Sequence, residues 1–416
     1  MVPDLRPEAV GAALSAAGVG PSGLSDLRPE VTRLDGGYSW ITLRVRWGAG
    51  DAVIVRVAPL GGTVEPYDPA AEALRLRAVA GVVPAPEVLA VCEEPNRIGR
   101  PFGVHTLMPG EAQRRPADPA RYREALATAL GALHSLADAN ALDVVADIGA
   151  AYEAELARQA DAYRRCWRHP GIDVAMRWLA LHRPSSTDRP VLCHGDFRPA
   201  NVLWTAPGAI GGIIDWERAW VGDPLCDVAF SMHLGGWGAI ESDAAAFYRE
   251  AGGAEIGDER LRYALRFERV RSYLSGMQGF AALEVGRADD PRLAEIGAAA
   301  QAGAWDLVAW LEPDLPPLSE VLEPPQAICP LHAEESPVMP AKGLPRTRSG
   351  AGIHPEPEPL GGRSDPAGHI AGWLERWENL TEQAATGGPE LIEPLEALAE
   401  RDRSASTMLQ VPWRDA

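Results

Sequence analysis

Lysine is almost absent from this chain of 416 residues, because Lys342 is its one lysine and arginine supplies every other long basic side chain. A site that ordinarily uses lysine must therefore use another residue here. Cysteine is also scarce, and the five cysteines are odd in number and scattered through apolar surroundings. This pattern favours a reducing compartment over a disulfide framework, so we expect a cytoplasmic protein.

Long apolar runs are missing as well. The longest apolar stretches fall short of the ~20 residues that a membrane-spanning helix needs. Residues 1–20 carry an acid and a proline where a signal peptide has a basic start and an apolar run, and they predict a short surface helix. We therefore expect neither a membrane span nor export. The formal net charge of −19 argues against nucleic acid and anionic membranes as partners, and it permits cationic small molecules.

Residues 31–107 predict a small lobe of antiparallel strands. Its strand segments alternate or are rich in β-branched residues, and the turns between them carry glycine and aspartate. One helix interrupts the strands at 68–81, where an Asp-Pro start, the spacing of Ala71, Leu74 and Val79, and a terminal glycine indicate its limits. The predicted strands are 31–35, 40–47, 52–58, 86–92 and 101–107.

Helical patterns dominate after residue 108. The predicted helices cover 121–139, 151–168, 223–233, 258–286 and 291–311. A pair of short strands, 201–204 and 211–216, lies among them and resembles a hairpin.

The chain is therefore predicted to be an α+β protein of two lobes with an extension. Residues 1–108 form the N-lobe with its leading helix, and residues 109–312 form the mainly helical C-lobe. Residues 313–416 are rich in proline and predict a disordered or extended linker. Two amphipathic stretches in it, 367–383 and 390–402, have the pattern of helices, and a protein partner for this extension stays open.

A polar loop lies between two apolar runs in residues 191–204, VLCHGDFRPANVLW. Asp196 and Asn201 stand five residues apart in it, and Pro199 prevents a continuous helix between them. Asp215 ends a third apolar run. Because strands that are neighbours in a hairpin bring their end residues together, these side chains are predicted to converge. Carboxylate and amide oxygens suit Mg²⁺, which leaves its other positions to water and substrate phosphates.

Phosphoryl transfer needs this set of groups. Its transition state spreads charge over phosphate oxygens and requires a metal ion, positioning and a carboxylate that receives the acceptor's proton. Asp196 is the predicted catalytic carboxylate, and Asn201 and Asp215 are the predicted metal ligands. His194 is better placed to brace the loop than to touch substrate.

These residues also carry a family resemblance. His194-Gly195-Asp196 with Asn201 matches the H-G-D-x-x-x-x-N catalytic loop of the aminoglycoside-phosphotransferase-like branch of the protein-kinase-like fold. Asp215 in I-I-D-W-E matches its metal-binding aspartate, and residues 222–229 resemble its G-D-P-x-x-D-[LV]-A motif. The resemblance spans roughly residues 20–312.

The nearest subgroup is the kinase-like domain that is fused to some acyl-CoA dehydrogenases. The resemblance implies a bilobal fold with a small antiparallel sheet and a mainly helical second lobe. It also implies ATP or GTP and Mg²⁺ as cofactors, with the hydroxyl of a small molecule as acceptor.

A nucleotide site is implied by the same resemblance. Gly36, Gly37 and Ser39 match a loop that covers phosphates, although a Gly-Gly pair equally suits an ordinary hairpin turn. Trp40 stands where the family more often has asparagine. The backbone of Met108 and Gly110 fits an interlobe hinge that would bond adenine, although an ordinary domain crossover would have the same sequence.

Arg56 occupies the place where protein kinases keep a lysine that pairs with nucleotide phosphates and with a helix glutamate. Glu72 is its natural partner. Arginine has a permanent charge and a forked donor geometry that suits phosphate, although an exposed strand arginine and a solvated glutamate are the simpler alternatives.

Three further residues have structural interpretations. Asp223 is predicted to cap the helix that follows it, and Asp227, one turn later, either packs there or reaches back to the backbone amides of the catalytic loop. His134 is predicted to be a buried core histidine. A zinc site at Cys329 and His332 is discarded because no second ligand pair stands at suitable spacing.

Two other functions compete with small-molecule phosphorylation. A nucleotide-binding scaffold without transfer chemistry would fit Arg56, Trp40 and the long extension. Phosphorylation of protein hydroxyls fits less well, because Trp-Glu rather than Phe-Gly follows Asp215 and no Ala-Pro-Glu segment is present.

Overall fold

The computed structural model describes two compact units. The first contains Met1–Leu60, Val64–Glu155 and Arg183–Arg269, and the second contains Gly61–Thr63, Leu156–His182 and Val270–Ala416. Within them the described residues are 3–20, 28–34, 37–48, 52–93, 98–112, 119–136, 145–186, 188–231, 244–304 and 307. The predictions for residues 313–416 and for Gly36 lie outside the described residues. The predicted lobe boundary after residue 108 falls within the first unit and stays a prediction.

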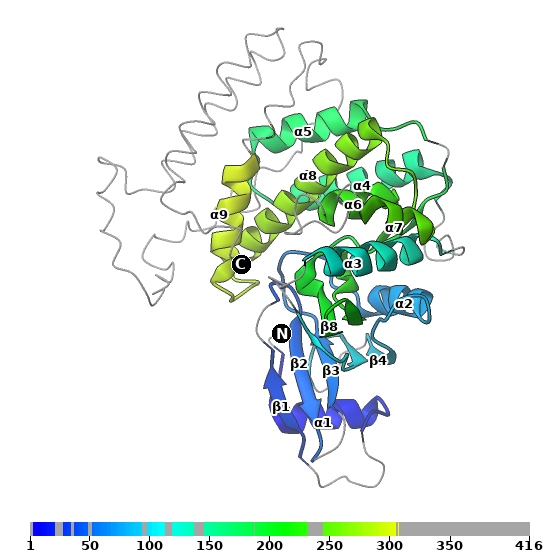
Figure 1. The fold of residues 1–416 in the computed structure, drawn as a ribbon. Coiled ribbons are helices and arrows are strands. Elements are labelled where there is room, and N and C mark those ends of the chain that lie inside the picture. The colour runs from blue at the N-terminus through cyan, green and yellow to red at the C-terminus, as the bar shows by residue number, and fades with distance from the viewer. Residues whose placement is uncertain are drawn as a thin grey trace, which may run out of the picture. The chain divides into compact units, whose positions relative to one another are not determined.

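A five-stranded antiparallel sheet begins the first unit (Figure 1). Its spatial order is β1 (Glu30–Arg33), β2 (Ile41–Arg46), β3 (Ala52–Val57), β5 (Phe102–Thr106) and β4 (Val88–Cys92). All five predicted strands are confirmed. Because β3 is central, Arg56 lies in register between Thr42 and Gly103, inside the sheet rather than at its edge.

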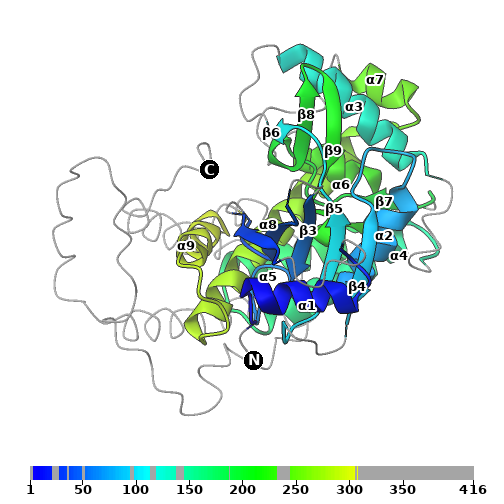
Figure 2. The same ribbon diagram turned by 90° about the horizontal axis from the view of Figure 1, so that it is seen from below.

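The helix α1 (Pro7–Ala16) packs against this sheet, and Figure 2 shows it lying across the strands. Val10, Ala13 and Leu14 are buried in the same core as residues of β2, β3 and β5. Their spacing of three and four residues places them on one helix face. The predicted surface helix is therefore present, but one of its faces belongs to the core.

The predicted helix after Asp68 is α2 (Pro69–Val79), and the Asp68 carboxylate accepts hydrogen bonds from two backbone amides of its first turn. The buried face agrees with the predicted apolar positions at Val79 and differs from them at Leu74, which is 54% exposed. Glu72 and Leu76 are buried on the same helix. The helix turns this way because Glu72 forms an ion pair with Arg56 of the sheet.

Helices and short strands make up the rest of the described chain. They are β6 (Glu111–Ala112), α3 (Pro119–His134), α4 (Ile148–Tyr163), α5 (Pro170–Leu181), β7 (Val191–Cys193), η2 (Pro199–Asn201), β8 (Val202–Ala206), β9 (Ala209–Ile213), η3 (Trp216–Arg218), β10 (Trp220–Gly222), α6 (Pro224–Ala229), α7 (Ala244–Glu250), α8 (Asp258–Glu284) and α9 (Arg292–Ala304). α3 and α7 lie side by side in both ribbon views. No helix in the described segments has the length and apolar character that crossing a bilayer requires.

The predicted hairpin is confirmed as β8 and β9, with β6 as a third antiparallel strand. The strand before the predicted catalytic loop, β7, lies outside this hairpin and pairs with β10 in a separate two-stranded sheet. Two helices, α5 and α7, were not predicted. Most of α5 is buried on all sides, and its charged residues Asp173 and Arg177 are buried with it.

Candidate active site

The loop between β7 and β8 is closed by its own side chains. The amide nitrogen of Asn201 donates to the main-chain oxygen of Asp196 at 2.9 Å and to its carboxylate Oδ2 at 2.8 Å. Pro199 begins a single 3₁₀ turn that ends at Asn201, so the chain bends where a longer helix was excluded. Asp196 and Asn201 are both buried. The structure thus joins the predicted catalytic carboxylate and one predicted metal ligand directly.

The carboxylate of Asp227, in α6, anchors this loop by hydrogen bonds. Its two carboxylate oxygens accept the backbone N–H groups of His194 and Gly195, each at 2.7 Å, and Nε2 of His134 lies 3.1 Å from Oδ2. The reach of Asp227 to the loop amides is confirmed, as are the cap at Asp223 and the buried, hydrogen-bonded His134. Burial alone would raise the pKa of Asp227, but the bonds from His134 and the backbone lower it overall.

Gly195 supplies the backbone shape that these bonds need. Its φ is +76°, and a Cβ atom there would overlap the backbone carbonyl of Arg218. A side chain at this position would therefore be strained twice, by conformation and by contact.

His194 connects the loop to the segment after β9. Its Nδ1 accepts from the backbone N–H of Asp196 at 3.2 Å, and its Nε2 lies 3.0 Å from the carbonyl oxygen of Ile214. Nε2 therefore carries the proton of a neutral ring, and burial lowers the pKa of His194 in agreement with this. The ring is fully buried, so its contacts are those of a side chain that braces the loop.

Asp215 lies on the adjoining segment. The backbone N–H of Ile214 donates to the carbonyl oxygen of Asn201 at 2.9 Å, which ties the two predicted metal ligands together. Asp215 adopts φ 71° and ψ 61°, the one positive φ outside glycine in the described chain. Aspartate tolerates this left-handed conformation better than most residues, at a cost of about 1–2 kcal/mol.

Arg56 forms the centre of a cluster of carboxylates. Its guanidinium lies 3.3 Å from Glu72, 2.8 Å from Asp215 and 2.8 Å from Glu217. The ring of Trp40 stacks near it, with 5.4 Å between the guanidinium carbon and the ring centroid. The predicted Arg56–Glu72 pair is present, and the alternative of an exposed strand arginine is wrong because the Arg56 side chain is only 11% exposed.

The charged groups in this cluster shift one another's pKa values. Burial raises the pKa of Glu217, and the neighbouring charge of Asp215 adds to the shift, whereas the guanidinium of Arg56 and the hydrogen bond from Ser39 favour its charged form. For Asp215, burial acts in the same upward direction, but the guanidinium of Arg56 lowers its pKa overall. Asp215 therefore carries the negative charge that a metal ligand needs.

Glu217 was missed by the sequence reasoning, although it lies two residues after Asp215. It accepts a hydrogen bond from the Ser39 hydroxyl at 2.7 Å as well as from Arg56. This bond ties the predicted phosphate-covering loop to the segment after β9. Gly37 belongs to the same loop, and a Cβ atom there would meet nothing within 4 Å.

Arg198 was also missed, and it lies inside the catalytic loop. Its Nε is 3.1 Å from Oδ1 of Asp196. The nearby charges of Asp196 and Asp215 raise the pKa of Arg198, while burial opposes that shift. One cation therefore faces the predicted catalytic carboxylate directly.

The predicted hinge packs against the β8–β9 hairpin. Gly110 has φ +103°, and a Cβ there would lie 2.7 Å from the backbone carbonyl of Trp204. A Cβ on Gly212 would likewise meet the Met108 side chain at 2.7 Å. The chain between the sheet and the helices is thus held closely at Met108 and Gly110, and adenine binding there stays a prediction.

Another group of potential ligands lies beneath the loop. One ligand atom each from His134, Cys193 and Asp227 falls within 4.8 Å of the others. His134 already bonds Asp227, and Asp227 bonds the backbone of the loop. This cluster therefore supports the loop, and the oxygen-bearing set of Asn201 and Asp215 is the better match to a hard cation.

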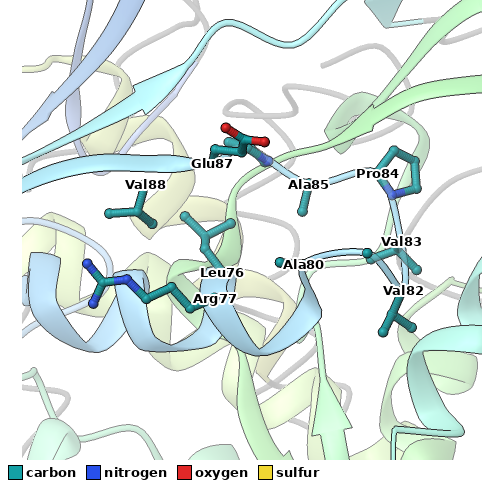
Figure 3. Close-up of a pocket in the computed structure, with 11 residues that line it drawn as sticks. Leu76, Arg77, Ala80, Val82, Val83, Pro84, Ala85, Glu87 and Val88 are labelled. Carbon is teal, nitrogen blue, oxygen red and sulfur yellow. The ribbon is translucent and has the colours of Figure 1, made fainter.

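A pocket of about 650 Å³ lies elsewhere in the first unit, between the end of α2 and the chain that leads to β4 (Figure 3). Leu76 and Arg77 line it from the helix, and residues 80–88 line it from the other side. It contains none of the predicted site residues. The carbonyl of Pro84 accepts from the backbone N–H of Ile213 at 2.7 Å, which links its wall to the strand before Asp215.

Comparison with known proteins identifies the family. The phosphotransferase enzyme family APH matches residues 30–267, which is more than half of the chain. The chain belongs to this family. The match contains the catalytic loop, Asp215 and Arg56, so the APH domain is the part of the molecule in which the candidate site lies.

Two curated relatives extend the comparison. The APH chain is 33% identical over 218 residues to acyl-CoA dehydrogenase family member 10 of Mus musculus, and the alignment covers 49% of this chain and 20% of that protein. It is 29% identical over 230 residues to the probable acyl-CoA dehydrogenase IBR3 of Arabidopsis thaliana, covering 49% and 28%. The chain thus spans about a fifth to just over a quarter of these relatives, as expected for the predicted subgroup.

Solved structures show the fold. An aminoglycoside-phosphotransferase-like protein of Ralstonia eutropha superposes with a TM-score of 0.52 at 21% identity, covering 71% of this chain and 95% of the other. The predicted α+β fold of the protein-kinase-like class is therefore confirmed for this APH protein.

Proposed function

We propose that this protein transfers the γ-phosphoryl group of ATP to a hydroxyl group of a small molecule, with Mg²⁺ as cofactor. The observation that carries the proposal is the buried Asp196, held by Asn201 at 2.8 Å in a loop that Asp227 anchors. A carboxylate fixed in this way suits positioning of an acceptor hydroxyl. Membership of the phosphotransferase family supports the reaction class.

Asp196 would orient the acceptor and receive its proton. In the transfer, the acceptor oxygen forms a bond to the γ-phosphorus, and the bond from that phosphorus to the bridging oxygen breaks, leaving ADP. His194 would keep the loop in shape, because both of its ring nitrogens are committed to backbone groups. Arg198 lies beside Asp196 and would offset negative charge at this point.

The donor atoms fit Mg²⁺. The Asn201 amide nitrogen is directed to Asp196, which leaves its oxygen as the atom for a cation, and the pKa of Asp215 is lowered. When bound, Mg²⁺ would neutralise charge on the nucleotide phosphates. The residues that would hold it are Asn201 and Asp215.

The nucleotide would be held by the predicted set on the sheet and the hinge. Ser39 and the glycines before it would cover the phosphates, and Glu72 would orient Arg56. Met108 and Gly110 would offer backbone groups to the base. ATP and GTP are both compatible with these contacts, and the small-molecule acceptor, the cytoplasmic location and the absence of nucleic-acid and membrane partners are part of the proposal.

One observation favours a second function, a nucleotide-binding protein without transfer. The Arg56 guanidinium bonds directly to Asp215 at 2.8 Å, where the transferase needs a metal ligand. If Arg56 keeps this bond with nucleotide present, Mg²⁺ meets a ligand that is already neutralised.

Two measurements on the same protein separate these functions. Thermal-shift titration with Mg-ATP reports binding, and a screen of small-molecule alcohols with γ-labelled ATP reports transfer. We expect a rise in Tm and a labelled product with one class of alcohol. A rise in Tm without any labelled product would support the scaffold, and no rise in Tm would contradict both functions.

A further inference from the structure

We propose that Glu217 is a positioning residue that couples the phosphate-covering loop to Arg56, so that nucleotide affinity depends on Ser39 and Glu217 as one unit. This inference rests on the proposed function and goes beyond it, because Glu217 is not among the residues to which a role in binding or transfer was assigned from the sequence.

A chain of hydrogen bonds carries the inference. The Ser39 hydroxyl donates to Oε2 of Glu217 at 2.7 Å, and NH2 of Arg56 donates to the same oxygen at 2.8 Å. The same guanidinium nitrogen donates to Oδ1 of Asp215 at 2.8 Å. Ser39 and Glu217 are 178 residues apart in sequence, so this contact joins the loop before β2 to the segment after β9.

Burial gives these contacts their weight. The side chains of Glu217 and Arg56 are 9% and 11% exposed. Water therefore competes little for their hydrogen-bonding atoms, and charge-assisted bonds in such surroundings are stronger than those at a surface. An exposed carboxylate with the same partners would contribute far less.

The guanidinium of Arg56 has enough donors for a third carboxylate, that of Glu217, to bond to it. The guanidinium of Arg56 offers several donors in a fixed plane, and Glu72 and Asp215 engage two sides of it. Glu217 engages NH2 as well and fixes the plane against rotation. Glu217 would position Arg56 and Ser39 together. Its loss would change nucleotide binding more than the transfer step, because neither partner contacts Asp196, the proposed catalytic carboxylate.

A double-mutant cycle on the full chain tests this coupling. Glu217→Gln keeps the size and one acceptor oxygen while removing the charge, and Ser39→Ala removes the donor. The affinity of each single variant and of the double variant for the magnesium complex of AMP-PNP is measured by calorimetry, which needs no turnover. Tm values show that each variant is folded. Glu30→Gln, which alters an exposed carboxylate paired with Arg46, is the matched control.

The expected result is non-additive. Glu217→Gln raises Kd about tenfold, the loss expected for one charge-assisted hydrogen bond, and it changes kcat by less than about threefold with any acceptor found. Adding Ser39→Ala to it has almost no further effect, whereas Ser39→Ala alone weakens binding by at least about threefold. The Glu30→Gln control binds like the wild type.

Additive losses in the cycle, or wild-type affinity in folded Glu217→Gln, would overturn the assignment and leave the proposed function standing. A wild-type protein that binds no magnesium-nucleotide would instead overturn the proposed function, and this inference with it. A fall in kcat at unchanged Kd would also contradict a positioning role toward the nucleotide.

Discussion

The two halves of the candidate site are held by different forces. The predicted catalytic loop is fixed by backbone N–H groups on one buried carboxylate, Asp227, and by the side chain of Asn201. The Arg56 cluster is fixed by charge, with one guanidinium among Glu72, Asp215 and Glu217. The loop therefore has its shape without a ligand. The cluster has more carboxylates than cations, so we expect it to respond to Mg²⁺, nucleotide and pH.

The largest effect on stability is expected from Asp227→Asn. The amide has one acceptor where the carboxylate has two, so its NH₂ group would oppose a backbone donor of the loop and the charge would be lost. We expect the free energy of unfolding to fall by about 3 kcal/mol, measured by urea denaturation.

The matched control is Asp188→Asn. Asp188 is likewise a bonded carboxylate, paired with Arg260 at 2.7 Å, but its side chain is 66% exposed. We expect a change below about 1 kcal/mol. Equal losses of unfolding free energy in the two variants would show that Asp227 contributes no more to stability than an exposed carboxylate does.

Two glycines give a second contrast, because one lies in each half. Gly195→Ala places a Cβ against the Arg218 carbonyl at a φ of +76°, and we expect a loss of about 2–3 kcal/mol in unfolding free energy together with a lower kcat. Gly37→Ala meets no atom within 4 Å, and we expect less than about 0.5 kcal/mol. Melting curves and activity at saturating substrate check both, and a larger effect at Gly37 would reverse the contrast.

The smallest expected effect is a pH dependence of stability that arises from His105, near Arg56. Burial lowers the pKa of His105 to about 3, and the positive charge of Arg56 contributes. The unfolded chain takes up this proton below about pH 6.5 and the folded chain does not, so stability is lost as pH falls from 6.5 toward 3.

At pH 5, proton uptake by His105 in the unfolded chain is expected to lower the free energy of unfolding by about 2 kcal/mol, at about 1.36 kcal/mol for each pH unit below 6.5. His105→Phe should therefore lose less unfolding free energy than the wild type between pH 7.5 and pH 5. Urea denaturation at both pH values measures the difference, and parallel losses would show that His105 is protonated without cost.

The sequence predicted the loop half of the site better than the charged half. His194, Asp196 and Asn201 lie within eight residues, so local spacing places them together whatever the distant chain does. Glu217 owes its place to Ser39, which is 178 residues away, and no local pattern reveals such a contact.

The fold shows the same division. The strands of the first sheet and the amphipathic helices were predicted because alternation and caps are local signals. The pairing of β7 with β10 was not, because pairing partners are set by tertiary contacts. The position of α5 was not predicted either, and its charged residues Asp173 and Arg177 are buried in the structure. The inward position of Glu72 on α2 likewise depends on Arg56 across the sheet.

The most direct test of the account is transfer of label from γ-labelled ATP to a small-molecule alcohol, by wild type and by Asp196→Asn. The account predicts Mg²⁺-dependent labelling by the wild type, with kcat lower in Asp196→Asn by about 10²–10⁴, the range for a positioned acid–base group, and with little change in nucleotide affinity. A folded Asp196→Asn variant that labels the acceptor as fast as the wild type would contradict it.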